Sequence, residues 1–200
     1  MVAGMSVFNT QNSLQIDDRF DTYSLASKFV TRDITASNLP VGINVFSPTT
    51  LGGEIQTAAP KTQLNDVTVY TFTKNVNIND NFGLQVFKAD GSTAFHSSGK
   101  PLRVVDFVRR KTHKPDGSRD YDPLTKYYSG YSRLGVVIPS TIAIVTLTGN
   151  INAGTALLFP SARINTDSIV FGYRPRYIPP EIYENPQGFN DFIVVDLTNY

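Results

Sequence analysis

Residues 67–73 read VTVYTFT, a run in which threonine is interleaved with valine and aromatic residues. This alternation has the period of two that is typical of a β-strand, with one face on a core and the other toward solvent or a partner. The run Val145-Thr146-Leu147-Thr148, which follows Ile142 and Ile144, repeats the pattern. Extended structure, and not helix, is therefore the first expectation for this chain.

Outward from these two runs lie further segments rich in Val, Ile, Thr, Phe and Tyr, most of them bounded by Gly, Pro, Asn or Asp. No window of 12 residues keeps apolar residues at helical spacing without a Pro or Gly that breaks it. We predict an all-β protein of at least about ten strands, an antiparallel β-sandwich or small barrel with long loops and an extended Pro-rich C-terminal segment. The further strands are expected at 22–30, 41–46, 134–138, 155–159, 168–173 and 192–197.

The predicted core is built from the apolar residues of these runs. In PLRVVDFVR, which begins at residue 101, Leu102, Val104 and Phe107 are interrupted by charged residues and are expected to face inward. Truncation of Phe87 or Phe107 to Ala would then cost about 3–5 kcal/mol. The full predicted set is Val86, Phe87, Phe95, Leu102, Val104, Phe107, Ile142, Ile144, Leu147, Ile169, Phe171, Ile193 and Val195.

Composition narrows the classes of function. The 200 residues hold 18 Lys and Arg against 17 Asp and Glu, so no overall charge attracts nucleic acid or an anionic membrane. Cys is absent, which excludes disulfides, thiolate metal sites and cysteine nucleophiles. No segment approaches 18 consecutive apolar residues, and the N-terminus lacks the pattern of a signal peptide. We therefore expect a protein that is made soluble in a cytoplasm.

Residues that could carry catalysis are few. His96 follows a predicted hairpin strand and His113 lies among basic residues, so both are interpreted as structural or solvated. The Asn-rich run 75–81 lacks the carboxylates of a calcium loop. No nucleophile elbow, phosphate-binding glycine loop or glycosidase carboxylate pair is present. We predict no enzymatic activity, no cofactor and no metal site.

Composition also suggests a domain boundary. Residues 47–65, SPTTLGGEIQTAAPKTQLN, are small, polar and broken by Gly and Pro, which predicts a linker or contact loop. We therefore divide the chain into an N-terminal β-hairpin module (1–46), this linker (47–65) and a main β-sandwich domain (66–200). The other long irregular regions are expected at 109–133 and, with four prolines, at 174–190.

Two segments resemble versions of one unit. At an offset of 79 residues, SVFNTQNSLQID, which begins at Ser6, aligns with QVFKADGSTAFH, which begins at Gln85. Each is interpreted as a tight hairpin followed by a third strand, and Asp90-Gly91 suits a type I′ turn. The pattern is compatible with an internal duplication and equally with two unrelated hairpins that obey the same rules.

The stretch 109–133 is basic and rich in tyrosine at once. Seven Lys and Arg stand there against three Asp, with four tyrosines interleaved, which is typical of interfaces with proteins or glycans. A solvated hairpin with Asp116-Gly117 at its tip, or binding of single-stranded nucleic acid, would use the same residues. The interface candidates, two of them from the Pro-rich segment, are Arg109, Arg110, Lys111, Tyr121, Tyr127, Tyr128, Tyr131, Tyr177 and Tyr183.

The string GLQVFKADGSTAFHSSGKPLRVVDF resembles a recurrent element in small proteins of long-tailed bacteriophages and their prophages, encoded near the tail-tip and tail-fibre genes. His96 stands where that family has Asp, so any role of that carboxylate does not carry over. The resemblance covers roughly residues 85–108. The matching residues are Gly83, Leu84, Gln85, Val86, Phe87, Gly91, Phe95, Ser97, Pro101, Leu102, Arg103, Val105 and Asp106.

The resemblance implies a non-enzymatic structural component of a virion tail, at the tail tip or the tail-fibre attachment. Its implied partners are other tail proteins, in a symmetric assembly that contains several copies of the chain. Neither nucleic acid nor insertion into a membrane is expected, because of the balanced charge and the lack of a long apolar run. Two alternatives stay open. One is a module that binds a host receptor or glycan, and the other is a capsid decoration protein.

Overall fold

The structure is a computed structural model. It describes residues 6–8, 14–17, 22–32, 34, 38–56, 66–74, 76, 78, 80, 83–111, 122–138, 144–147, 155–178 and 189–200. Within these ranges all the regular secondary structure is β-strand, and all strand pairs are antiparallel. The sheets are not closed into a barrel, and the predicted all-β class is confirmed. No helix in the described ranges is long and apolar enough to cross a membrane.

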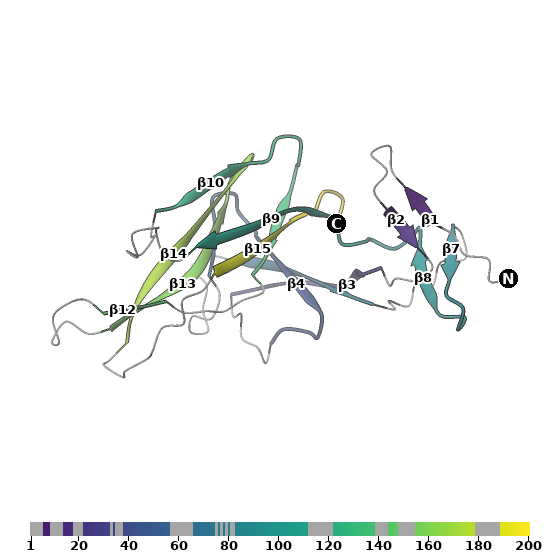
Figure 1. The fold of residues 1–200 in the computed structure, drawn as a ribbon, viewed down its shortest axis with the longest axis horizontal. Coiled ribbons are helices and arrows are strands. Elements are labelled where there is room, and N and C mark those ends of the chain that lie inside the picture. Colours follow the sequence, from purple (N-terminus) through teal and green to yellow (C-terminus); the bar gives the residue numbers. More distant parts are fainter. Residues whose placement is uncertain are drawn as a thin grey trace.

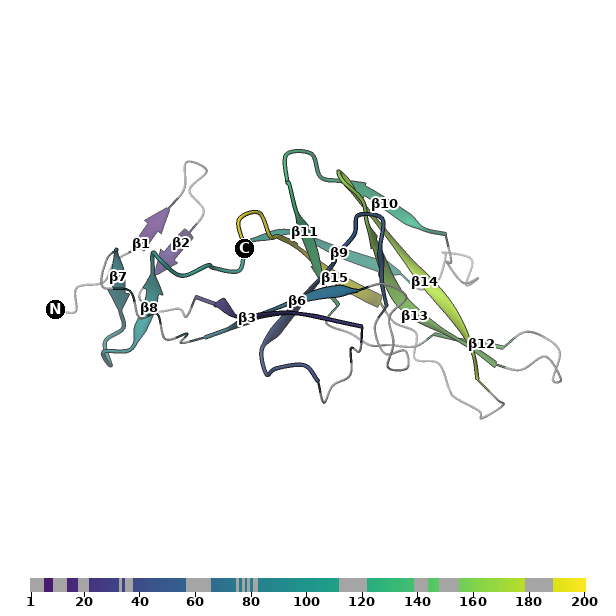
Figure 2. The same cartoon turned by 180° about the vertical axis from the view of Figure 1, so that it is seen from behind.

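The larger sheet has six strands and contains the VTVYTFT run as its second strand (Figures 1 and 2). Segments that are far apart in the sequence pair in this sheet, and its two edge strands come from the first and the middle part of the chain. In spatial order its strands are β3 (Ser24–Thr31), β6 (Val67–Thr73), β4 (Ile43–Pro48), β11 (Leu134–Val137), β15 (Phe189–Asp196) and β9 (Val104–Lys111).

The second sheet has five strands and is dominated by one long hairpin, whose ten register pairs run from Thr155↔Ile178 to Ile164↔Ile169. A short strand from the predicted linker joins this hairpin on one side. The strands are β10 (Leu124–Tyr127), β14 (Ser168–Ile178), β13 (Thr155–Ile164) and β12 (Ile144–Leu147) in order, with β5 (Glu54–Gln56) also paired to β13.

The two sheets pack face to face over one hydrophobic core. Phe171 of the five-stranded sheet contacts Phe192 of the six-stranded sheet, with ring centroids 4.8 Å apart. Such tilted aromatic pairs add to the free energy gained by apolar burial. Other members of this core are Phe46, Ile55, Val67, Val69, Val108, Tyr128, Leu134, Val136, Ile138, Ala162, Ile164, Ile169 and Val194.

The six-stranded sheet is also covered on its outer face. Tyr70 and Phe72 of β6 point away from the inter-sheet core into a second cluster with Val45, Val137, Val195 and Leu197. The C-terminal Tyr200 packs over this outer cluster, with its ring centroid 5.8 Å from that of Phe72. Strand β6 is therefore buried on both faces, whereas its alternating sequence predicts one face toward solvent or a partner.

Two small hairpins lie together at one end of the molecule, away from the two larger sheets (Figures 1 and 2). The first consists of β1 (Ser6–Phe8) and β2 (Leu14–Asp17), and the second of β7 (Gln85–Phe87) and β8 (Thr93–His96). Chain segments on either side of Tyr23 and Leu102 connect these hairpins to the six-stranded sheet.

The predicted division into domains does not follow the sheets. Strand β3, placed in the N-terminal module 1–46, and strand β4, which begins in that module and ends at Pro48, pair with β6 throughout their length. Residues 47–65, expected to be a linker or contact loop, contain β5, and Ile55 within that strand is fully buried. Because β4 and β5 belong to different sheets, the intervening residues form a corner of the sandwich; residues 57–65 lie outside the described ranges.

The irregular region predicted at 174–190 is also wrong in its first part. Residues 174–178 continue β14 and pair with β13, and Pro175 lies opposite Leu158. Pro is tolerated here because β10 pairs only with Ser168 to Phe171, so no strand among the described residues needs the missing N–H on that side of β14. Residues 179–188 are not described.

The predicted core set is correct at Val86, Ile169, Phe171 and Val195, all of which are buried. Phe95, Leu102 and Ile193 are half-buried, while Phe87, Val104 and Phe107 are exposed, which contradicts their assignment. Leu102, Val104 and Phe107 do share one face, but it is the outer face of an edge strand, beyond the outer cluster. Ile142 and the side chains of Ile144 and Leu147 lie outside the description.

Candidate interaction surface

Strand β9 forms one edge of the six-stranded sheet, so the orientation of its side chains determines which of them are accessible to a partner. Val104 pairs with Val195 and Asp106 with Val194, so Val105 is an extra residue in a β-bulge. After the bulge the alternation resumes one step out of phase, which turns Asp106 toward the inter-sheet side and Phe107 outward.

The inward side of β9 closes the sandwich at its edge. The Asp106 carboxylate accepts hydrogen bonds from Lys126 Nζ at 2.8 Å and from the Tyr128 hydroxyl at 2.9 Å. Asp106 comes from the six-stranded sheet, whereas Lys126 lies on β10 of the five-stranded sheet. Tyr128 is the first residue after β10. These contacts form a polar clasp between the two sheet edges.

The clasp shifts the ionisation of both partners. Burial raises the pKa of Asp106, but the hydrogen bonds from Lys126 and Tyr128 outweigh it and leave the pKa below its ordinary value. Burial, followed by the hydrogen bond to Asp106, raises the pKa of Tyr128. The folded protein therefore favours an ionised Asp106 and a neutral Tyr128.

Arg110 extends the clasp along the same strand. Its side chain is buried, and Nη1 donates to the carbonyl oxygen of Phe171 at 3.0 Å while Nη2 donates to the carbonyl oxygen of Asp122. Both acceptors belong to the five-stranded sheet or to the residues that lead into it. Arg110 therefore serves packing of the sheets and is not available to a partner.

The outward side of β9, together with β15, forms a different surface. We call the outward side chains of Val104, Phe107, Arg109, Asp191 and Ile193 the β9 surface. Phe107 is 70% exposed, and a shallow groove of about 280 Å³ runs beside it with mostly apolar walls. Arg109 pairs with Asp191 through two hydrogen bonds, of 2.8 and 3.0 Å.

This salt bridge lies at the surface and orders its two side chains more than it stabilises the fold. The Asp191 hydrogen bond raises the pKa of Arg109, and the same bond lowers the pKa of Asp191. An apolar aromatic side chain thus stands beside a fixed pair of opposite charges. That combination suits recognition of a protein surface.

The structure divides the predicted interface residues. Arg109 is exposed and Tyr127 is 77% exposed, as an interface requires. Arg110 and Tyr128 are buried in the clasp, so their assignment to an interface is wrong, because β9 and the end of β10 turn them toward the core. Tyr131 is half-buried against the inter-sheet core.

The remaining candidates cannot be placed. Lys111 and Tyr177 lie in β9 and β14, but their side chains are outside the description, as are Tyr121 and Tyr183 altogether. Sequence reasoning missed Phe107, Asp191 and Ile193 as surface residues. A charged residue two positions on from an apolar one, as in Phe107 and Arg109, is the signal that could have marked this outward face.

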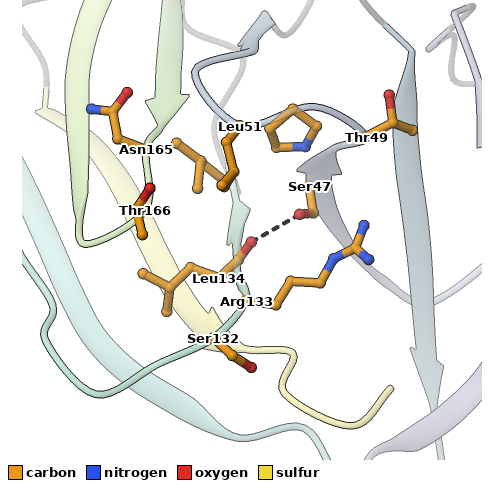
Figure 3. Close-up of a pocket in the computed structure, with 10 residues that line it drawn as sticks. Ser47, Thr49, Leu51, Ser132, Arg133, Leu134, Asn165 and Thr166 are labelled. Atoms are coloured by element: carbon orange, nitrogen blue, oxygen red, sulfur yellow. Dashed lines mark hydrogen bonds between the residues drawn. The ribbon is translucent and has the colours of Figure 1, made fainter.

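A second hollow of about 180 Å³ lies where β4, β11 and the turn after β13 meet. Figure 3 shows Ser47 facing Leu134, and its hydroxyl donates to the Leu134 carbonyl oxygen at 2.9 Å. Arg133 is engaged as well, with its guanidinium 5.6 Å from the centre of the Tyr70 ring. None of the described lining residues is His, Asp or Glu, so no general base stands beside Ser47.

His96 has a structural position. It is buried at the end of β8, and its Nδ1 accepts the backbone N–H of Ser98 at 3.2 Å. An Asp side chain at this position could accept the same bond. Among the described residues no group of three or more His, Asp or Glu is placed to hold a metal ion.

Comparison of the chain with protein-family models, with curated proteins and with solved structures finds no match.

The clasp predicts a pH-dependent effect of Tyr128→Phe. Loss of the hydroxyl removes a hydrogen bond to Asp106 and is expected to lower the free energy of unfolding by about 1 kcal/mol at pH 7. Because folding lowers the pKa of Asp106, ionised Asp106 stabilises the folded protein above the unfolded pKa, near 4. This stabilisation is lost as the pH falls further. Because folding raises the pKa of Tyr128, its neutral hydroxyl stabilises the folded protein below about pH 10, and this stabilisation is lost as the pH rises further.

The difference between wild type and Tyr128→Phe should therefore shrink at both ends of the pH range. Urea unfolding between pH 3 and 10.5 measures it. Tyr127→Phe, the neighbouring exposed residue, is the control and should match wild type throughout. A difference independent of pH would show that the clasp does not act through Asp106.

Proposed function

We propose that this protein is a non-enzymatic structural component of a bacteriophage virion, at the tail tip or the tail-fibre attachment, and that it binds a neighbouring virion protein through the β9 surface. The resemblance to phage tail proteins suggests the location in the virion, and the residues that carry it run through β7, β8 and the start of β9. The all-β sandwich with open sheet edges is compatible with repeated assembly against other proteins.

The observation that carries the proposal is Phe107. A large aromatic side chain that is mostly exposed, beside an apolar groove and an ordered Arg–Asp pair, is typical of an interface anchor. The edge itself is protected against indiscriminate strand pairing by its bulge and its basic residues. Recognition would therefore use the outer side chains of β9 and not its backbone.

The test is incorporation into particles. Phe107→Asp should fold with the melting temperature of wild type, because the side chain is exposed, but its amount in purified phage particles should fall about tenfold or more. Phage assembled in cells that express each variant are purified, and the chain is quantified by mass spectrometry.

Val30→Asp is the matched control. Val30 is exposed on β3, at the opposite edge of the same sheet, and its substitution should leave incorporation unchanged. Equal loss with both variants would contradict a specific role of the β9 surface. Absence of the wild-type chain from particles would contradict the virion assignment itself.

Labelled antibody on the same particles separates the tail from a decoration role on the head. A receptor or glycan role is less favoured, because Tyr127 is exposed while Tyr128 is buried, so the two do not form one stacking platform. Tyr127→Ala alone, and not the double variant that would disturb the clasp, is therefore the variant for a glycan-binding assay.

A further inference from the structure

We infer that the chain contains two copies of one structural unit, a β-hairpin followed by a bulged strand, and that each copy is the binding partner of the other. The first copy covers β1, β2 and β3, and the second covers β7, β8 and β9. This inference is independent of the proposed virion role.

The hairpin strands of the two copies have identical limits at an offset of 79 residues. Strand β1, Ser6–Phe8, corresponds to β7, Gln85–Phe87, and β2, Leu14–Asp17, corresponds to β8, Thr93–His96. The sequence agrees at the same offset. Gly4, Val7, Phe8 and Ser13 recur as Gly83, Val86, Phe87 and Ser92.

The pairing within the hairpins is the same as well. Val7 pairs with Ile16 as Val86 pairs with Phe95, and in both hairpins the register then shifts by one residue before the next pair. Two unrelated hairpins would share a preference for turn residues, but not the position of an irregularity in the ladder. The shift between Val86 and Phe87, and its equivalent between Val7 and Phe8, lies within the ladder and not in the turn, and such bulges are conserved features within families.

The third strands complete the correspondence. In β3, Leu25 pairs with Phe72 and Ser27 with Thr71, so Ala26 is the bulged residue. In β9, the bulged residue is Val105, which is Ala26 plus 79. The two bulged strands form the opposite edges of the six-stranded sheet, so each copy ends by flanking the same sheet.

The copies meet in an antiparallel crossing. The N–H of Leu25 donates to the carbonyl oxygen of Lys100, and the N–H of Leu102 donates to that of Tyr23, both at 2.8 Å. Ser24 and Pro101 form the bridge between these bonds. Tyr23 and Leu102 are equivalent residues that lie opposite each other in this register.

This arrangement is that of an isologous interface, in which the same surface is used by both partners. In this register a local two-fold axis would pass between Tyr23 and Leu102, and it would relate the Ser24–Pro101 pair to Thr22 with Arg103. Figures 1 and 2 show the two hairpins side by side beyond this crossing. The surface of one unit therefore fits a second copy of the unit, which here is supplied by the same chain.

Transplantation tests the equivalence of the copies in the full-length chain. Residues 4–17 are replaced with the sequence of residues 83–96, which we expect to preserve the hairpin and shift the melting temperature by no more than about 2–4 °C. Residues 84–97 placed in the same position are the matched control, because a one-residue slip turns every side chain to the opposite face.

The readout is hydrogen exchange of the Leu25 and Leu102 amides, which report the crossing. Retained protection in the transplant and loss in the slipped control support the inference. Loss of protection in both the transplant and the slipped control, or equal retention of protection in both, overturns the inference.

The absence of Cys allows a second measurement. Thr22→Cys with Arg103→Cys should form a disulfide within one chain as readily as Ser24→Cys with Pro101→Cys, because both pairs would lie at closely spaced positions of the crossing. Val30→Cys with Arg103→Cys is the control and should stay reduced. Only intermolecular disulfides, or none at the Thr22–Arg103 pair, would overturn the internal two-fold.

Discussion

Replacement of Phe171 with Ala is expected to lower the free energy of unfolding by about 3–5 kcal/mol. Phe171 is fully buried on β14, and its ring packs on Phe192 from the opposite sheet. Truncation therefore leaves a cavity between the two layers, which the β-sheets on either side cannot close by collapse. Urea unfolding followed by fluorescence or circular dichroism measures the change, with an unchanged m-value expected.

Phe107→Ala is the paired control for this prediction. Its side chain is largely exposed on the β9 surface, so the expected change in the free energy of unfolding is within about 0.5 kcal/mol. Equal effects at the two positions would mean that β9 does not turn Phe107 outward. The comparison thus tests the bulge as well as the core.

Replacement of Arg110 with Met is expected to cost about 2–4 kcal/mol. The aliphatic part of the side chain is retained, but the buried carbonyl oxygen of Phe171 and the partly buried carbonyl oxygen of Asp122 lose this donor. Each buried acceptor without a partner costs about 1–3 kcal/mol. The same unfolding measurement at pH 7 determines the effect.

Arg109→Met, one residue earlier on the same strand, provides the contrast. It removes the exposed ion pair with Asp191, for which the expected cost is below about 1 kcal/mol. If the two arginines prove equally important to stability, the assignment of Arg110 to the inside and Arg109 to the outside is incorrect. If they differ as expected, the basic cluster of the sequence has two separate roles.

This division of one cluster explains how the two sheets are joined at their β9 and β10 edges. Asp106 and Arg110 both reach from the six-stranded sheet to groups of, or next to, the five-stranded sheet. Phe107 and Arg109, their immediate neighbours, point the other way. A single strand therefore closes the sandwich with one face and presents a surface with the other.

The candidate site was predictable only in part. Composition identified the stretch after residue 108 as unusual, and Arg109 and Tyr127 are indeed exposed. Tyr128 could not be separated from Tyr127 by residue type, because adjacent residues of a strand point to opposite sides and the strand's orientation is a tertiary property. Phe107 was assigned to the core because apolar character alone does not reveal which face of a sheet is covered.

By itself the sequence determined the all-β class, the position of most strands and the repeated pattern at an offset of 79, because these depend on local periodicity and spacing. The tertiary structure alone decided that β6 is buried on both faces, that the supposed linker contributes β5 and that β9 is an edge. These outcomes depend on which distant strands pair and on where a bulge shifts the alternation by one residue. Neither is encoded in the local pattern of a single strand.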